Sequence, residues 1–225
     1  MVTRAVEDYL KAIYKLQRDG APATTNAIAD ILGLRAASVT AMFQQLSEHG
    51  MADYTPYRGA TLTPKGMATA LRVIRRHRLI ELYLHQHLDV PWDRVHDEAE
   101  RLEHAISPYL EERIDASLGY PGFDPHGAPI PTSAGALIER DLVALYDLPL
   151  NTPSVVRHIP DDDPNLLRHV AELGLIPDTT VSLVERDITT GAVTVQLHTI
   201  SPEDKTPLLQ ITRAVAQQVF VNRPN

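Results

Sequence analysis

The chain of 225 residues contains no cysteine, which excludes disulfides, cysteine-ligated zinc sites and a thiol nucleophile. It also lacks an apolar run as long as a membrane-spanning helix requires. The first residues enter a helical pattern directly, without the apolar core of a secretory signal. These absences predict a cytoplasmic protein, and 44% hydrophobic residues are enough to form a buried core.

A positive net charge is also absent, since the formal net charge of the chain is −8. This value argues against a protein that coats nucleic acid without regard to sequence. The charge is unevenly distributed, however. Residues 1–80 hold eleven Lys or Arg against six Asp or Glu, and residues 81–225 hold ten against twenty-three. The asymmetry indicates a nucleic-acid partner for the N-terminal third.

Three helices are predicted at the start of the chain. Apolar residues at helical spacing favour a helix over 4–18, a short helix capped by Thr25 and ending at Gly33, and another over 35–46. Two short helices joined at a glycine are typical of a helix-turn-helix. Small and polar side chains on the second of them can approach base edges and phosphates. The residues expected at DNA, including two in the following turn, are Thr25, Asn26, Arg35, Ala36, Ser38, Thr40, Gln44, Tyr57 and Arg58.

A β-hairpin is predicted directly after these helices. Residues 51–55 and 60–63 form two short strand-like runs, and the turn between them carries Tyr57 and Arg58. Such a hairpin is the wing of a winged helix, whose basic tip reaches the phosphate backbone or the minor groove. A winged helix can also bind proteins. The basic charge of this segment favours DNA.

The most distinctive stretch of the chain is 96–104, which contains two histidines and four acids. We expect a helix here that continues to about residue 107. Successive residues of a helix are about 100° apart around its axis, so two imidazoles and two carboxylates would lie within one arc of about 100° on the helix surface. These residues are His96, Glu100, Glu103 and His104. Taken alone, an acidic helical face with a histidine is more often simply solvated than a ligand set.

A second pair strengthens the metal interpretation. His77 and Glu81 stand four residues apart on a helix predicted over 65–88. Imidazole and carboxylate groups without sulfur form a ligand set for a divalent transition metal. The lone His126, in a turn-rich loop over 119–135, is expected to be structural or solvated.

The remaining pattern predicts a mainly α protein with a β C-terminal domain. Surplus apolar residues on the helix over 65–88 indicate a dimer interface, and a two-fold dimer reads a palindromic operator. Five short strand-like runs after residue 149, with one helix over 164–173, suit a small β-barrel. The expected domains are 1–64, a winged helix-turn-helix; 65–148, a helical metal-binding and dimerisation domain; and 149–225, the barrel.

This order of segments resembles the diphtheria toxin repressor family of metal-dependent transcriptional repressors. The resemblance covers nearly the whole chain. It rests on Glu7-Asp8-Tyr9-Leu10 with Ile13-Tyr14, on the run from Arg76 to Glu81, on the 96–104 stretch, and on the loop from His126 to Pro131. It implies that the C-terminal domain is SH3-like and that the protein is a metal-sensing regulator, a repressor in the control of metal homeostasis.

Carried over by position, the resemblance implies two metal sites. The primary site would consist of Asp8, Glu100, Glu103 and His104. The ancillary site would consist of His77, Glu81, His96 and Asp163, with Asp161, Asp162 and Glu172 as alternatives to the last. Iron-type members have Met and Cys where Asp8 and Glu100 stand, and manganese-type members have acids. Hard oxygen ligands favour Mn²⁺ in relative terms, so we expect Mn²⁺, with Fe²⁺ as the alternative.

The expected mechanism joins these parts, because an ion held between Asp8 and the later acid-and-imidazole helix would set the spacing of two recognition helices in a homodimer. Two other functions stay open. A carboxylate-bridged di-metal enzyme would need Glu-x-x-His repeats from two helices, and the sequence has none. We therefore expect no enzyme. A winged-helix regulator of an organic ligand, with a structural ion, is the other alternative.

Overall fold

The computed structural model describes residues 3–198 and 208–224, which form two compact units. The first unit comprises residues up to His77 together with 103–106 and 131–136. The second unit comprises residues 78–102, 107–130 and those from 137 onward. The three expected domains, 1–64, 65–148 and 149–225, stay a prediction.

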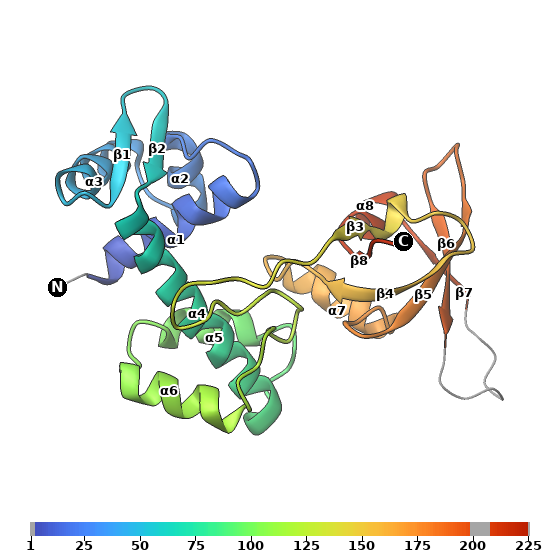
Figure 1. Ribbon diagram of the computed structural model, residues 1–225. Coiled ribbons are helices and arrows are strands. Elements are labelled where there is room, and N and C mark those ends of the chain that lie inside the picture. The colour runs from blue at the N-terminus through green and yellow to red at the C-terminus, as the bar shows by residue number, and fades with distance from the viewer. Residues whose placement is uncertain (1–2, 199–207, 225) are drawn as a thin grey trace. The chain divides into compact units, whose positions relative to one another are not determined.

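The first unit begins with three helices, α1 (Arg4–Arg18), α2 (Thr25–Leu32) and α3 (Ala36–Glu48), shown in blue in Figure 1. Each helix buries one apolar stripe, and the large side chains at the centre are Leu10, Ile13, Ile28, Phe43 and Leu46. The cap of α2 differs from the expectation. Thr24, and not Thr25, accepts the N–H of Ala27 at 3.2 Å, because Thr24 has the extended backbone that an N-cap requires.

The wing consists of β1 (Ala52–Thr55) and β2 (Gly59–Leu62), which pair antiparallel. Gly59 has a φ of +96°, and a Cβ there would lie 2.2 Å from the carbonyl oxygen of Ala23. That close approach lets the N–H of Ala60 donate to the same carbonyl at 3.0 Å. The base of the wing is therefore fastened to the segment before α2, and Tyr57 at the tip is fully exposed.

Three further helices follow the wing: α4 (Pro64–Leu88), α5 (Val95–Leu102) and α6 (Pro108–Ser117). The prediction of a helix continuing to about residue 107 is wrong, because α5 ends at Leu102. Glu103 and His104 lie in the turn that follows, so the predicted single helical stripe is not formed. Ser107 caps the next helix, α6, and Pro108 occupies its first position. No helix in the described ranges is both long and apolar enough to cross a membrane.

The C-terminal part is an antiparallel sheet in the order β3-β8-β4-β5-β6-β7. Its strands are β3 (Leu142–Ala144), β4 (Pro153–His158), β5 (Thr180–Arg186), β6 (Val193–His198), β7 (Leu208–Ile211) and β8 (Phe220–Asn222). A short 3-10 helix (Leu145–Asp147), α7 (Pro164–Glu172) and α8 (Arg213–Ala216) complete it. The five predicted strands are present, but β3 and α8 were not predicted. Both are too short for a periodic pattern to reveal.

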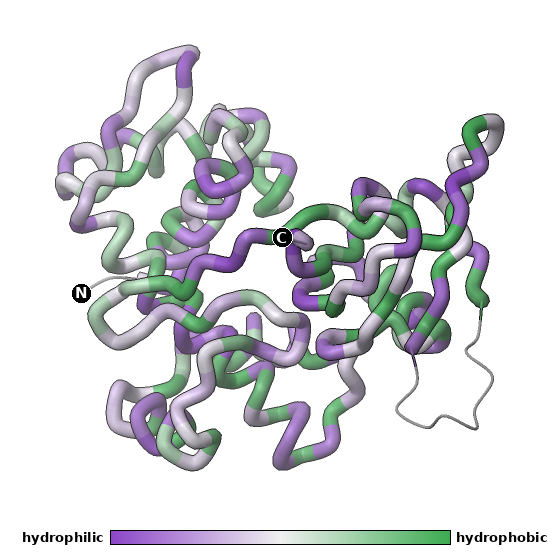
Figure 2. Tube along the Cα trace, turned by 45° about the vertical axis from the view of Figure 1, so that its right-hand side comes forward, coloured by the Kyte–Doolittle hydropathy of each residue, from purple (hydrophilic) through white to green (hydrophobic). Residues whose placement is uncertain are grey.

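The sheet follows the alternation expected of strands with one buried face. Along β6, Val193, Val195 and Leu197 are buried while the residues between them are partly exposed. Figure 2 shows the same interleaving of hydrophobic and hydrophilic residues along the trace of this domain. Together with Leu145, Leu167 and other apolar side chains these residues form a separate hydrophobic core.

Candidate metal centres

Asp8, Glu103 and His104, all in the first unit, form a compact group that we call the first cluster. Each offers one ligand atom, and these atoms lie within 4.8 Å of one another. Nε2 of His104 is 2.8 Å from Oδ1 of Asp8 and 3.3 Å from Oε1 of Glu103. Nevertheless this buried nitrogen has no aligned hydrogen-bond partner among the described residues. Donor atoms that converge without hydrogen-bond geometry fit a shared cation, so the residues present suit a metal ion.

Glu7 was not among the expected site residues, yet it controls the orientation of His104. Its Oε2 lies 2.6 Å from Nδ1 of His104, and its Oε1 accepts from the guanidinium of Arg76 at 2.8 Å. A carboxylate on one ring nitrogen holds the proton there and leaves the other nitrogen as a lone-pair donor. The signal available in the sequence was the pair of adjacent acids, Glu7 and Asp8, in the first turns of the first helix.

The side chains of Lys11 and His77 both contact the carboxylate of Glu103. Nζ of Lys11 is 2.8 Å from Oε2 and 3.1 Å from Oε1 of Glu103, and it is 3.2 Å from Nδ1 of His77. That same imidazole nitrogen lies 2.5 Å from Oε2 of Glu103. Burial would raise the pKa of Glu103, but the hydrogen bond from His77 and the charge of Lys11 together lower it. Glu103 is therefore a buried carboxylate anion. The expected role of His77 in the ancillary site stays a prediction.

Glu81, Asp124 and His126 form the second cluster, within the second unit. All three side chains are buried, and their ligand atoms lie within 4.8 Å of one another. Oδ2 of Asp124 and Nδ1 of His126 have no hydrogen-bond partner among the described residues. Burial and the charge of Glu81 raise the pKa of Asp124 to about 7, although Arg78 opposes the shift. Two buried carboxylates beside an imidazole nitrogen also suit a cation.

His126 is buried by a rigid loop. Oδ1 of Asp124 accepts the N–H groups of His126 and Ala128, each at 2.9 Å, and Nε2 of His126 lies 3.0 Å from the carbonyl oxygen of Trp92. Gly127, between His126 and Ala128, has a φ of +85°, and a Cβ there would lie 1.7 Å from the carbonyl oxygen of Arg157. The loop is therefore pressed against β4. Of the two expected alternatives, a solvated His126 is wrong, because the side chain is fully buried beside two acids.

His96 adjoins the second cluster. Its Nδ1 lies 3.1 Å from Oε1 of Glu81 and 3.3 Å from Oδ2 of Asp161. Burial lowers the pKa of His96, but hydrogen bonds to Asp161 and Glu81 outweigh it and raise the pKa to about 10. A proton therefore occupies this imidazole in the metal-free chain, and a bound metal would have to displace it.

Asp163 lies at the N-terminus of α7, and its expected place in the ancillary site stays a prediction. Its Oδ1 accepts the N–H of Asn165 at 2.8 Å and so caps α7. The carboxylate that reaches His96 from the C-terminal domain is Asp161, two residues earlier. Glu100 lies on α5 with Oε1 3.8 Å from Nε2 of His96, and its expected place in the primary site stays a prediction.

The expected DNA-contacting residues lie on α2, α3 and the wing of the first unit. On α3, Val39, Phe43 and Leu46 face the core, which leaves the opposite face to solvent. The exposed members of the expected set are Asn26, Arg35, Ala36, Ser38, Gln44, Tyr57 and Arg58, and Thr25 and Thr40 are half-buried. Their contact with DNA stays a prediction that this placement permits.

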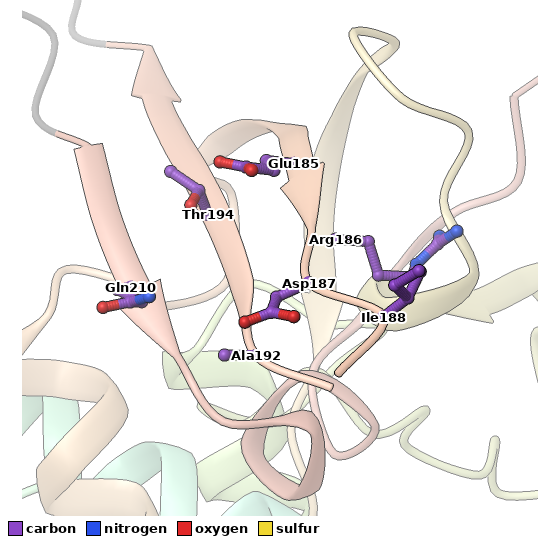
Figure 3. A pocket seen from close by; sticks show the side chains of 7 residues that line it. All are labelled: Glu185, Arg186, Asp187, Ile188, Ala192, Thr194 and Gln210. Carbon is purple, nitrogen blue, oxygen red and sulfur yellow. The ribbon is translucent and has the colours of Figure 1, made fainter. Parts of the chain in front are cut away.

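A pocket on the C-terminal sheet, seen in Figure 3, is separate from both clusters. It is lined by Glu185, Arg186, Asp187, Ile188, Ala192, Thr194 and Gln210. The guanidinium of Arg186 donates to the carbonyl oxygen of Tyr146 at 2.5 Å, so this cation is already used within the domain. The pocket contains none of the residues proposed here for metal or DNA.

Three family models match successive parts of the chain. Residues 1–60 match the iron-dependent repressor N-terminal DNA-binding domain, and residues 63–132 match the iron-dependent repressor metal-binding and dimerisation domain. Residues 143–223 match the FeoA domain. The matches bear out the predicted repressor resemblance and a C-terminal β domain.

Individual relatives agree with these matches. The iron-dependent repressor IdeR of Mycobacterium leprae is 33% identical over 189 residues, which cover 79% of this chain and 82% of that protein. The regulator MntR of Lysinibacillus sphaericus is 37% identical over 114 residues, which cover 51% of this chain and 81% of that protein. A solved manganese-dependent transcriptional repressor in complex with manganese is 34% identical, with a TM-score of 0.87 over 96% of this chain and 99% of the other. The chain therefore belongs to the diphtheria toxin repressor family of iron- and manganese-dependent, DNA-binding transcriptional repressors.

Proposed function

We propose that this repressor senses Mn²⁺ through the first cluster, with Fe²⁺ as the second candidate metal. The observation that carries the proposal is the convergence of Nε2 of His104 with carboxylate oxygens of Asp8 and Glu103, without any sulfur ligand. Oxygen-rich ligand sets favour manganese relative to metals that prefer thiolates. From the sequence pattern alone, Glu100 is the fourth proposed ligand.

The control of DNA binding follows from where these ligands stand. Asp8 lies on α1, which packs against α2 of the helix-turn-helix, whereas Glu103 and His104 belong to the stretch that matches the metal-binding and dimerisation domain. Asp8, Glu103 and His104 would hold the ion, which would supply positive charge between the two carboxylates. The chain's own part is to hold α1 against segment 103–106. Metal and DNA then strengthen each other reciprocally, by roughly 1–3 kcal/mol.

The second cluster is the proposed ancillary site. Glu81 and His96 are kept from the sequence-based set, and Asp161 replaces Asp163 because it reaches His96. Asp124 and His126 are added because each has a buried ligand atom without a hydrogen bond, close to the ligand atoms of the others, although Oδ2 of Asp124 also lies 3.5 Å from Nε of Arg78. We propose that this site steadies the second unit.

The rest of the proposal concerns partners. The match to a dimerisation domain supports a homodimer, and a two-fold dimer reads a palindromic operator. We place its action in the cytoplasm and expect no enzymatic activity, because the proteins it matches are named as transcriptional repressors.

A metal titration against DNA tests the proposed function. Duplexes selected from a random pool by the protein in Mn²⁺ would supply the operator, and its affinity would then be measured with increasing Mn²⁺ or with a chelator. We expect binding to require the metal. An affinity that is indifferent to EDTA would refute the sensor function, and purified protein without bound metal would favour an organic ligand.

The wing makes a separate prediction. Arg58 at its tip is exposed, and Arg58→Ala is expected to weaken binding to all sequences alike and to lower the salt slope by about one. The measurement is the affinity for operator and random DNA over a range of salt concentrations. Arg223→Ala, in the C-terminal domain, is the control. A change confined to one base position would instead make Arg58 a base reader.

A further inference from the structure

Gln17, in the last turn of α1, is hydrogen-bonded to the wing. Its Oε1 accepts the backbone N–H of Leu62, the last residue of β2, at 2.9 Å. We propose that Gln17 is a positioning residue for DNA binding, which holds the base of the wing on α1 so that Arg58 at the tip reaches the phosphate backbone. The inference rests on the proposed contact of Arg58 with DNA.

Two hydrogen bonds at the base of the wing come from the same edge of β2. β1 pairs with the other edge, and alternate residues of an antiparallel strand direct their N–H groups away from the partner. Ala60 donates to the carbonyl oxygen of Ala23 at 3.0 Å, and Leu62 donates to Gln17. The first acceptor is main chain. The second is the end of a side chain, so a substitution can remove it without altering the backbone.

The bond to Gln17 matters because both partners are half-buried. An N–H that loses its acceptor away from water costs more than the bond contributes, so the base of the wing would shift to hydrate it. The wing has little resistance to such a shift. Its two strands have four residues each, and a two-stranded hairpin is at most marginally stable by itself. Its position therefore depends on what holds its edge.

The tip of the wing would follow a movement of its base. The N–H of Arg58 donates to the carbonyl oxygen of Thr55 at 3.0 Å and closes the turn. Pro56 is second in this turn and Tyr57 is third, with a φ of +66°, an arrangement typical of a type II turn. The fixed φ of the proline restricts the turn further. The place of Arg58 is thus set by the orientation of β1 and β2.

α1 is a firm support for the wing, and Gln17 is remote from the first cluster. Leu10 and Ile13, in the middle of α1, are fully buried. Asp8 and Gln17 are nine positions apart, which at about 100° per residue places them on opposite faces of the helix. Substitution of Gln17 should therefore change the contact of the wing with DNA without changing the binding of Mn²⁺.

The test is a double-mutant cycle in the full-length protein with saturating Mn²⁺. Gln17→Met keeps the length of the side chain and removes the acceptor, and Arg58→Ala removes the cation. Operator affinity is measured over a range of salt concentrations. We expect each single variant to lower the salt slope by about one, and the double variant to lower it by no more, because both substitutions remove the same phosphate contact.

Two further variants make the cycle specific. Gln17→Glu keeps an acceptor oxygen, so Arg58→Ala in that background should still lower the salt slope by about one. Gln218→Met, at an exposed glutamine of the C-terminal domain, is the control and should leave the slope unchanged. A wild-type slope in Gln17→Met, or a fall of about two in the double variant, would overturn the inference.

Amide hydrogen exchange tests the bond without DNA or metal. We expect Gln17→Met to speed exchange of the Leu62 amide by about tenfold, and to affect the Thr61 amide less, since Thr61 lies opposite Asp53 and its N–H faces β1. An unchanged rate at Leu62 would show that Gln17 does not hold the wing, and would contradict the proposal.

This inference and the proposed Mn²⁺ sensing fail in different ways. Sensing fails if operator binding ignores EDTA, whatever the salt slopes are. If binding requires Mn²⁺ but the effects of Gln17→Met and Arg58→Ala add, the wing contacts DNA independently of Gln17 and only this inference fails. If Arg58→Ala alone leaves the slope unchanged, the tip does not contact phosphate, and the role of Gln17 fails while sensing stands.

Discussion

His104→Ala is expected to abolish the Mn²⁺ response of operator binding, with a loss of metal affinity of at least about 100-fold. The imidazole is the group in the first cluster whose one nitrogen approaches both Asp8 and Glu103. Without it, two carboxylates remain with no nitrogen ligand between them. The measurement is the Mn²⁺ concentration that gives half-maximal binding of labelled operator.

Further variants distinguish the loss of a metal ligand from the loss of a residue that only orients one. Glu7→Gln keeps the ring but removes the anion at Nδ1, and its expected loss of metal affinity is smaller, about 10–100-fold. His169→Ala, an exposed histidine on α7, is the control and should leave the response unchanged. His126→Ala should cost far less than His104→Ala. An equal loss would move the controlling site to the second cluster.

Gly127→Ala is expected to destabilise the second unit by about 3 kcal/mol or more. The new Cβ would lie 1.7 Å from the carbonyl oxygen of Arg157, which is backbone and cannot rotate away as a side chain could. The loop would have to leave β4 and take Asp124 and His126 with it, so metal binding at the second cluster should be lost as well. Urea unfolding and dialysis against Mn²⁺ measure the two effects.

Gly119→Ala is the matched control for this prediction. Gly119 has a similar φ of +74°, but a Cβ there would meet nothing within 4 Å. Its cost is therefore limited to the strained backbone, about 1–2 kcal/mol. If the two variants unfold at the same urea concentration, the contact with Arg157 has no energetic importance and the loop is not fastened as described.

The helices could be predicted well because their signals are local. Apolar residues at helical spacing placed the first helix at its observed bounds, Arg4–Arg18. The end of α5 could not be predicted in the same way. Glu103 leaves the helical pattern and contacts Lys11, a residue 92 positions earlier, and no rule of helical periodicity contains that partner. The strand β3 was missed for a similar reason, since it pairs with β8 near the end of the chain.

In the candidate sites, too, some residues could be predicted from the sequence and others could not. The resemblance named Asp8, Glu103 and His104, which the structure brings together. It could not decide between Asp161 and Asp163, because that choice depends on which carboxylate caps α7. Nor could the sequence single out Glu7 or Asp124. Their importance comes from burial and from partners distant in the chain.

The contacts between α1 and the His104 side chain restrict how α1 can move. Two consecutive residues, Glu7 and Asp8, approach opposite nitrogens of one imidazole ring. Neighbours on a helix are separated by about 100° around its axis, so a screw motion of one residue would detach both carboxylates at once. Motions of α1 that keep the ring engaged are thus tilts about His104, and these would swing the far end of the helix while its rotational phase stays the same.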